Sequence, residues 1–242
     1  MARTIIKAIG ILAVLQLLVA FLAFAGSSAN PPAHAILGMA IFGLYFLWII
    51  IGGLVQYRVR DTVKALWNRI ALKRWLKFGL LATILALIEE AITTAMTNTA
   101  SLYGTTPAAA HITASTNYLN VVLTHSVIFF APMLFIWGWI LSRYDLSPEA
   151  VFLSWGLTGT IMETVYGGPQ QIIGIGMWAF VYGLMIYLPA YCISGDRPNL
   201  RAPSWWQRLL FIFIPLLGVI PGGILSAIFK AILHTHYLPG VQ

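Results

Sequence analysis

The sequence has few charged residues and almost no cysteine. Only 9% of its 242 residues are charged, compared with about 25% in an ordinary soluble domain, whereas 60% are hydrophobic. This balance excludes a typical water-soluble globular protein. The single cysteine, Cys192, has no partner for a disulfide within the chain and cannot form a cysteine metal cluster.

The charge that is present has an excess of one sign, with 14 Lys and Arg residues against 7 Asp and Glu residues. A nucleic-acid-binding protein would carry such cations together on a solvated face. Here long uncharged apolar runs separate them, which argues against nucleic acid as a partner. We therefore attribute the basic excess to orientation in a lipid bilayer.

Seven apolar segments are long enough to cross a hydrocarbon core of about 30 Å as helices. The sequence therefore predicts an all-α fold, a polytopic integral membrane bundle of seven transmembrane helices. Residues 1–242 would form a single transmembrane helical domain. The predicted spans are residues 5–25, 35–57, 78–98, 119–141, 150–165, 172–193 and 209–232, and a basic interfacial segment is predicted at residues 58–77.

The cations are confined to alternate loops of this arrangement. The loops at residues 26–34, 100–118 and 166–171 contain no charged residue, whereas every Lys and Arg except Lys230 lies on the other side. By the positive-inside rule the N-terminus is inside and the C-terminus outside. We expect an integral protein of a prokaryotic cytoplasmic membrane.

The first apolar segment has two interpretations. Arg3 and Lys7 precede it and Ala23-Phe24-Ala25 follows near its end, which is also typical of a cleaved secretory signal. The apolar run is longer than the usual 7 to 15 residues of a signal sequence, so we favour a retained span. Cleavage would leave six spans.

Three of the acidic residues, Glu89, Glu90 and Glu163, fall inside predicted spans. Each would cost about 2.5–3.5 kcal/mol at the centre of a bilayer if it were charged and unpaired, so such residues usually face the bundle interior. Counting 1.5 Å per residue places Glu90 about 18 Å and Glu163 about 20 Å from the inner side, and His125 about 9 Å from the outer side. The three side chains would therefore lie in one layer.

Helical periodicity places further polar residues beside these acids. At 100° per residue, positions 89, 90, 93, 94, 97 and 98 cover half of one helix, which predicts a polar cavity there. In the span at 150–165, Gly156, Gly159 and Glu163 share one face, where small residues favour close approach of a second helix. Tyr182 could donate a hydrogen bond to the cluster, although tyrosine in such a bundle usually only packs.

The favoured chemical interpretation is a membrane-embedded, metal-assisted enzyme. Glu90, His125 and Glu163 could ligate a divalent transition metal such as zinc, iron or manganese, which accept mixed nitrogen and oxygen ligands. Glu89 could orient a ligand or act as a general base, so all four residues are candidate catalytic residues. A small lipid-soluble or membrane-anchored substrate would suit a site buried in the bilayer.

Two alternatives use the same residues differently. The carboxylates could bind and release protons or cations in a transporter or channel. In the other alternative the protein is a non-catalytic subunit of a membrane complex, and its Glu and His side chains only form hydrogen bonds between helices.

Residues 88–94 (IEEAITT), followed one helix later by His125, resemble the first two motifs of the CAAX prenyl protease and bacteriocin-processing membrane proteases. That resemblance implies activation of water for peptide cleavage inside the membrane. The chain departs from the family at Thr94, where an arginine is usual, and at Val121, where a phenylalanine is usual. A third-motif histidine is also missing from the later predicted spans, so we do not assign the chain to this family.

Overall fold

The computed structural model describes residues 2–110, 113–194 and 200–236, with side chains as far as residue 233. Every regular element in these ranges is helical, which confirms the predicted all-α class. A single isolated bridge joins Tyr144 to Arg201 and holds two loops together. Asp196 and Arg197, which belong to a predicted basic loop, lie outside the described residues.

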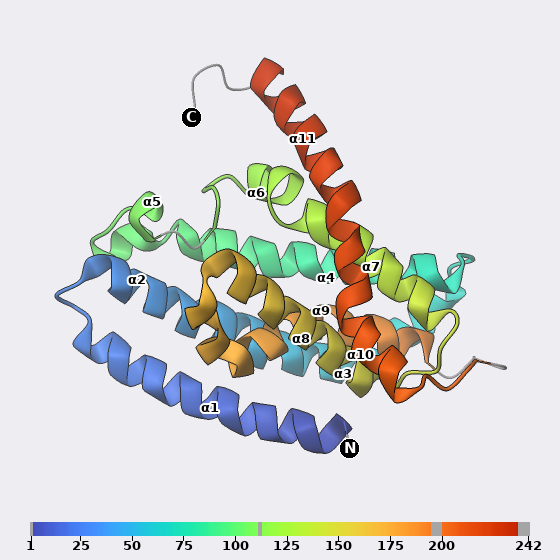
Figure 1. Ribbon diagram of the computed structural model, residues 1–242. Helices are drawn as coiled ribbons and strands as arrows, with labels where there is room; N and C mark the ends of the chain where they lie inside the picture. The colour runs from blue at the N-terminus through green and yellow to red at the C-terminus, as the bar shows by residue number, and fades with distance from the viewer. Residues whose placement is uncertain (1, 111–112, 195–199, 237–242) are drawn as a thin grey trace.

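The helices follow one another with short connections (Figure 1). In chain order they are α1 (Ala2–Gly26), α2 (Pro31–Met39), the π-helix η1 (Ala40–Gly52), α3 (Gly53–Arg69), α4 (Arg74–Thr97), η2 (Ala100–Tyr103), α5 (Pro107–Ala110), α6 (Tyr118–Thr124), α7 (Val127–Leu141), α8 (Pro148–Gly167), η3 (Pro169–Gly174), α9 (Ile175–Ile193), α10 (Trp205–Phe213), η4 (Ile214–Gly218) and α11 (Val219–His236).

Five helical segments of the described chain are long and apolar enough to cross a membrane, or six if the bent pair α6 and α7 counts as one span. The five are Ala2–Gly26, Pro31–Arg69, Arg74–Thr97, Pro169–Ile193 and Trp205–Leu233. The predicted span at 150–165 corresponds to α8, which is a regular helix but is not in this set. Its Gly, Ser, Thr and Glu residues make α8 less apolar than the others.

The second candidate span is longer than predicted. Residues 31–69 form one uninterrupted helix, so residues 58–69 of the predicted basic segment continue the helix of the span before it. The helix ends at Ile70, whose backbone is extended (φ −75°, ψ 126°). The indole of Trp67 then donates to the carbonyl of Lys77 at 3.1 Å, which ties the end of α3 to the start of α4.

The predicted span at 119–141 is broken, because α6 and α7 meet at an angle of 49°. The break falls at His125 and Ser126, neither of which has helical backbone angles. Polar side chains compensate for the interrupted helix: the Thr124 hydroxyl donates to the carbonyl of Asn120, and the Ser226 hydroxyl of α11 donates to the carbonyl of Thr124, both at 2.6 Å. The break sets the position of His125.

The helices α8 and α9 form the most closely packed pair. A Cβ atom at Gly156 would lie 2.6 Å from the carbonyl oxygen of Ala179, and one at Gly159 would overlap the ring of Tyr182. Only glycine allows so close an approach, as the small-residue face of the sequence predicts. Around this pair the side chains of Trp137 and Trp155 are fully buried in the apolar core.

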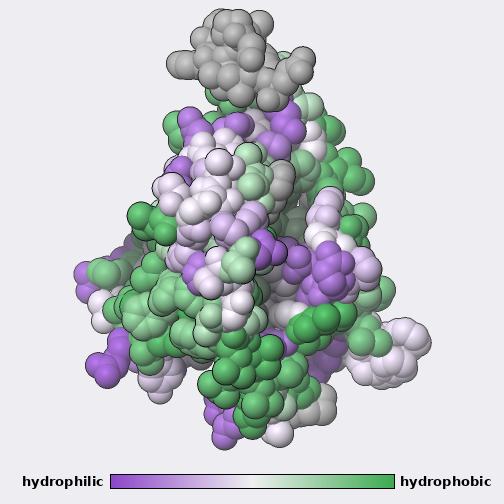
Figure 2. Space-filling model, turned by 90° about the vertical axis from the view of Figure 1, so that its left-hand side faces the viewer, coloured by the Kyte–Doolittle hydropathy of each residue, from purple (hydrophilic) through white to green (hydrophobic). Residues whose placement is uncertain are grey.

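Basic segments from distant parts of the chain gather at one end of the molecule, on the right in Figure 1. At this end the Arg3 guanidinium binds Glu149 at 2.9 Å, and the Lys64 ammonium donates to the carbonyl of Ser194 at 2.7 Å. The opposite end holds the turn between α1 and α2. Seen from that end in Figure 2, hydrophilic side chains gather across the middle, and apolar side chains cover large areas below them.

Candidate functional site

A cavity of about 260 Å³ lies among α4, the α6–α7 break, α8 and α9. Glu89, Glu90, His125 and Glu163 all line it, so the structure brings together the four side chains that the sequence singled out. Thr93, Ser126 and Tyr182 add hydroxyl groups to its wall. We call this space the carboxylate cavity.

The two adjacent acids of α4 are turned inward. Glu89 and Glu90 are only 6% and 7% exposed, and Thr94 and Thr97 on the following turns are also buried. The polar half of α4 therefore faces the bundle and not the lipid, which follows from the high cost of a polar face in hydrocarbon. Asn98, at the end of this half, is exposed and donates to the carbonyl of Thr116 at 3.0 Å.

Glu90 has hydroxyl neighbours on two helices. The Thr93 hydroxyl, one turn further along α4, lies 3.2 Å from the Glu90 Oε1 atom and can donate to it. The Ser126 hydroxyl, from the α6–α7 break, also faces this carboxylate. By contrast, Glu89 forms no side-chain hydrogen bond with any other residue that the structure describes, and its neighbouring charges are Glu90 and Glu163.

Glu163 of α8 is held by Tyr182 of α9, whose hydroxyl donates to the Glu163 Oε1 atom at 2.5 Å. This contact depends on Gly159, because any side chain there would occupy the space of the Tyr182 ring. From the sequence alone, Tyr182 was predicted only as a possible hydrogen-bond donor. The one sequence feature that distinguishes Tyr182 is its place on the helix that packs against the glycine face of α8.

His125 lies at the rim of the carboxylate cavity, and its side chain is exposed. The sequence placed the imidazole in a continuous helix at the same buried level as the acids. Because the helix breaks between α6 and α7, His125 lies one residue beyond the end of α6. Its side chain therefore does not lie on a continuous face of that helix. Lys230 of α11 lies close enough to act electrostatically on the imidazole.

The arrangement does not form a recognisable metal site. Within the described ranges, no group of three or more His, Cys, Asp or Glu side chains could hold a metal ion. Three ligands must converge on one point about 2 Å from each donor atom to bind zinc. The carboxylate cavity gathers the predicted ligands around one space without that convergence, so the metal stays a prediction from the sequence.

Among the residues that the structure describes, the acids of the cavity have no cationic partner. The two ion pairs among the described side chains join Arg3 to Glu149 and Arg60 to Asp61, and neither includes a residue of the cavity. No Lys or Arg lines the cavity. Three carboxyl groups thus share a small space between helices without a Lys or Arg beside them, a condition that bound protons or a bound cation must relieve.

The loop between α4 and α6 covers one side of the carboxylate cavity. Thr113 and Ala114 line it directly, and the Thr113 hydroxyl donates to the Thr97 hydroxyl at 3.1 Å. His111 of the same loop lies outside the described residues. The loop is therefore part of the site and not only a linker.

No protein-family model matches the chain, and neither a curated protein nor a solved structure matches it.

Proposed function

We propose that the protein is an integral membrane carrier that binds and releases protons, or a small cation in their place, at Glu89, Glu90 and Glu163. The observation that carries this proposal is the set of three carboxyl groups lining one cavity, without a Lys or Arg partner among the described residues. In apolar surroundings such groups are stable when they hold a proton or a cation, and they become costly when they lose it. A carrier uses this difference in stability between the loaded and the empty site to bind and release its cargo.

The size of the cavity favours a small cargo. A volume of about 260 Å³ is below the range of about 300–1,000 Å³ that is usual for organic ligands. It could hold about nine water molecules at roughly 30 Å³ each. A lipid-anchored peptide or other large substrate would need more room, so the size of the cavity supports a small cargo such as protons or a cation.

The hydroxyl groups and the imidazole supply a route for protons. Tyr182 donates to Glu163, and Thr93 is placed to donate to Glu90, so these two carboxylates are stabilised by a donor when they are ionised. His125 at the exposed rim can exchange protons with the solvent. In this proposal His125 carries protons between water and the buried acids.

The proposal includes seven membrane crossings, with the basic end of the molecule and the N-terminus inside. Its support is the gathering of Arg3, Lys64 and Arg201 at one end, together with the uncharged loops of the sequence. Cysteine labelling in a Cys192→Ala background tests this orientation. An impermeant maleimide should label Ser28→Cys from outside intact cells and Arg69→Cys only after lysis, since both positions are exposed.

Proton flux into proteoliposomes, followed with an enclosed pH-sensitive dye under an imposed gradient, tests the carrier itself. We expect Glu163→Gln to lower the flux by about tenfold or more, because the amide cannot exchange a proton. Glu149→Gln is the matched control, since it changes a glutamate at the start of the same helix and outside the cavity. Equal flux in the two variants, or one equivalent of tightly bound transition metal in the purified protein, would contradict the proposal.

A further inference from the structure

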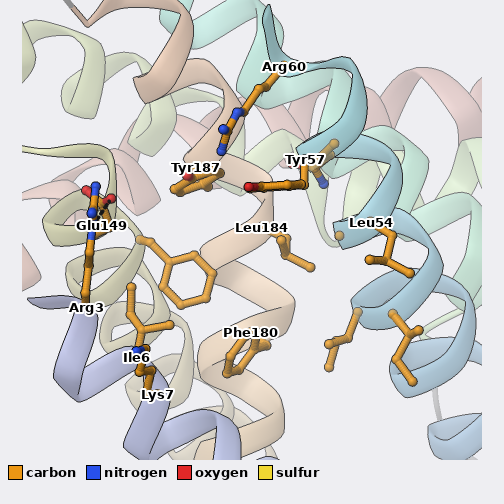
Figure 3. A pocket seen from close by; sticks show the side chains of 15 residues that line it. Arg3, Ile6, Lys7, Leu54, Tyr57, Arg60, Glu149, Phe180, Leu184 and Tyr187 are labelled. Carbon is orange, nitrogen blue, oxygen red and sulfur yellow. Dashed lines mark hydrogen bonds and ion pairs between the residues drawn. The ribbon is translucent and has the colours of Figure 1, made fainter.

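A second and larger cavity, of about 720 Å³, lies between α1 and α3 over the surface of α9. Figure 3 shows α1 and α3 on its two sides, with Phe180, Leu184 and Tyr187 of α9 between them. Its volume is within the usual range for organic ligands. It shares no lining residue with the carboxylate cavity. We call it the basic pocket.

The lining of the basic pocket changes from polar to apolar along the helix axes. Arg60 and Tyr57 lie at one end of its α3 wall, and Ile49 and Ile50 lie about 15 Å further along the same continuous helix. On α9 the order is the same, from Tyr187 to Phe180, and Figure 3 shows Arg60 and Tyr187 together at the polar end. An occupant must therefore have a polar end and a long apolar part.

The charge of the lining selects an anionic polar end. Three cations, Arg3, Lys7 and Arg60, line the pocket with a single acid, Glu149. Arg3 uses its Nε atom on Glu149, which leaves the two terminal nitrogens of its guanidinium for another anion. Arg60 lies over the ring of Tyr57 at 4.1 Å, and its Nε atom is 3.9 Å from the Asp61 Oδ2 atom. These contacts leave the two terminal nitrogens of its guanidinium available for an anion.

Gln56 is a buried polar residue in the wall of the pocket. Its side chain lines the pocket and is only 5% exposed, and neither its Nε2 nor its Oε1 atom has a hydrogen-bond partner in the part of the chain that the structure describes. A buried amide without partners is costly, and native proteins rarely leave one. Gln56 lies on α3 between the apolar residues and Arg60, at the level where ester carbonyls of a glycerolipid would follow its phosphate.

From these observations we infer that the basic pocket binds a membrane phospholipid with an anionic headgroup. The phosphate lies between Arg3 and Arg60, the glycerol esters lie beside Gln56, and an acyl chain lies along α9 between α1 and α3. Lys7, one turn further along α1, lies nearer Phe180 (Figure 3). The largely exposed α1 forms one wall, so the lipid enters laterally from the bilayer. This binding site is separate from the proposed proton site.

Equilibrium binding of phosphatidylglycerol with a fluorescent acyl chain to the detergent-purified full-length protein tests the inference. Unlabelled phosphatidylglycerol should displace the probe, and phosphatidylcholine with the same acyl chains should compete at least tenfold less well. Glycerol phosphate should not compete at accessible concentrations, because it has no acyl chain to fill the apolar end. Absence of saturable binding, equal competition by the two lipids, or effective competition by glycerol phosphate would overturn the inference.

Substitutions of residues that line the pocket test whether the lipid binds there. Arg60→Gln and Arg3→Gln should each weaken binding about fivefold, the usual effect of one cation near an anionic lipid. Arg58→Gln is the matched control, since Arg58 is exposed on the same helix and does not line the pocket. Gln56→Leu should keep the protein folded and weaken binding several-fold. Equal binding by the Arg60→Gln and Arg58→Gln variants, or undiminished binding by Gln56→Leu, would show that the lipid does not occupy this place.

Discussion

The carboxylate cavity and the basic pocket lie on opposite faces of the same helix, and they differ in the sign of their charge. Trp178 and Tyr182 of α9 face the carboxylate cavity, whereas Phe180 and Leu184 face the basic pocket. The first is lined by three acids and no Lys or Arg, and the second by three cations and one acid.

The comparison shows how position in the bundle decides what a charged side chain can do. The cations of the basic pocket lie at the charged end of the molecule, where water and lipid headgroups can neutralise them. The acids of the carboxylate cavity lie between helices, where a bound proton or cation must neutralise their charge. The same helix therefore separates the proposed lipid site from the proposed proton site.

The largest effect should come from damage to the wall that the two cavities share. Gly156→Val would place side-chain atoms against the Ala179 backbone and push α8 away from α9. We expect a loss of about 3 kcal/mol of stability, since overpacking against backbone has no flexible atom to relieve it. Thermal unfolding in detergent measures the loss, and both proton flux and lipid binding should fall.

Gly53→Ala is the control for this change. A Cβ atom at Gly53 would lie 3.6 Å from the Leu184 side chain, which is an ordinary contact. Alanine also favours a helix over glycine by about 1 kcal/mol. The unfolding temperature of this variant should stay the same or rise; if Gly156→Val were equally harmless, the close packing of α8 on α9 would be wrong.

A smaller and more selective effect is expected at Tyr182. Tyr182→Phe removes the hydroxyl that donates to Glu163, at a cost of about 1 kcal/mol for a hydrogen bond of this kind. Proton flux should decrease while binding of phosphatidylglycerol stays the same, because Tyr182 does not line the basic pocket.

Tyr187→Phe provides the reverse control on the same helix. Tyr187 lines the basic pocket and is not part of the carboxylate cavity, so this variant should keep its proton flux. If either tyrosine variant changed both activities to the same extent, the two cavities would not be independent.

The smallest effect concerns the ion pair of Arg3 and Glu149. Burial opposes ionisation of Glu149, but its own backbone N–H, the Arg3 guanidinium and the Ser147 hydroxyl outweigh it and hold the pKa of the carboxyl below its usual 4.5. Arg3 is 83% exposed, so the pair contributes less than about 1 kcal/mol.

The sign of the pH dependence follows from this lowered pKa. The contribution of Glu149 is fully present above pH 4.5 and is lost as the pH falls through the lower folded-state value. Arg3→Gln should reduce this acid-dependent part of the stability, as measured by thermal unfolding between neutral and acidic pH. If Arg3→Gln reduced the stability at neutral pH by more than Gly156→Val does, the predicted order of the two effects would be wrong.

Sequence reasoning predicted much of the fold because helical spans depend on local properties. The apolar runs, the loops between them and the glycine face of α8 all follow from composition and periodicity over one segment at a time. The break at His125 could not be predicted in this way, because no proline or glycine marks it. A contact from the distant residue Ser226 stabilises it.

The candidate site was predicted in part for the same reason. Glu89, Glu90 and Glu163 are recognisable because an acid inside an apolar run is costly wherever the helix packs. Tyr182 as a donor to Glu163, and Gln56 without a partner, depend on which helix lies beside which. The basic pocket could not be predicted at all, since Arg3, Arg60 and Tyr187 are far apart in the chain.

The sequence by itself determined that the chain is helical, with several segments long and apolar enough to cross a membrane and with acids placed among their apolar residues. The reason is that the cost of polar groups in hydrocarbon acts on each segment separately. Only the tertiary structure decided that these acids share a small cavity, that His125 is exposed at its rim, and that cations from α1 and α3 meet on the other side of α9. The reason is that contacts between helices depend on the packing of all of them together, as the glycines of α8 against α9 illustrate.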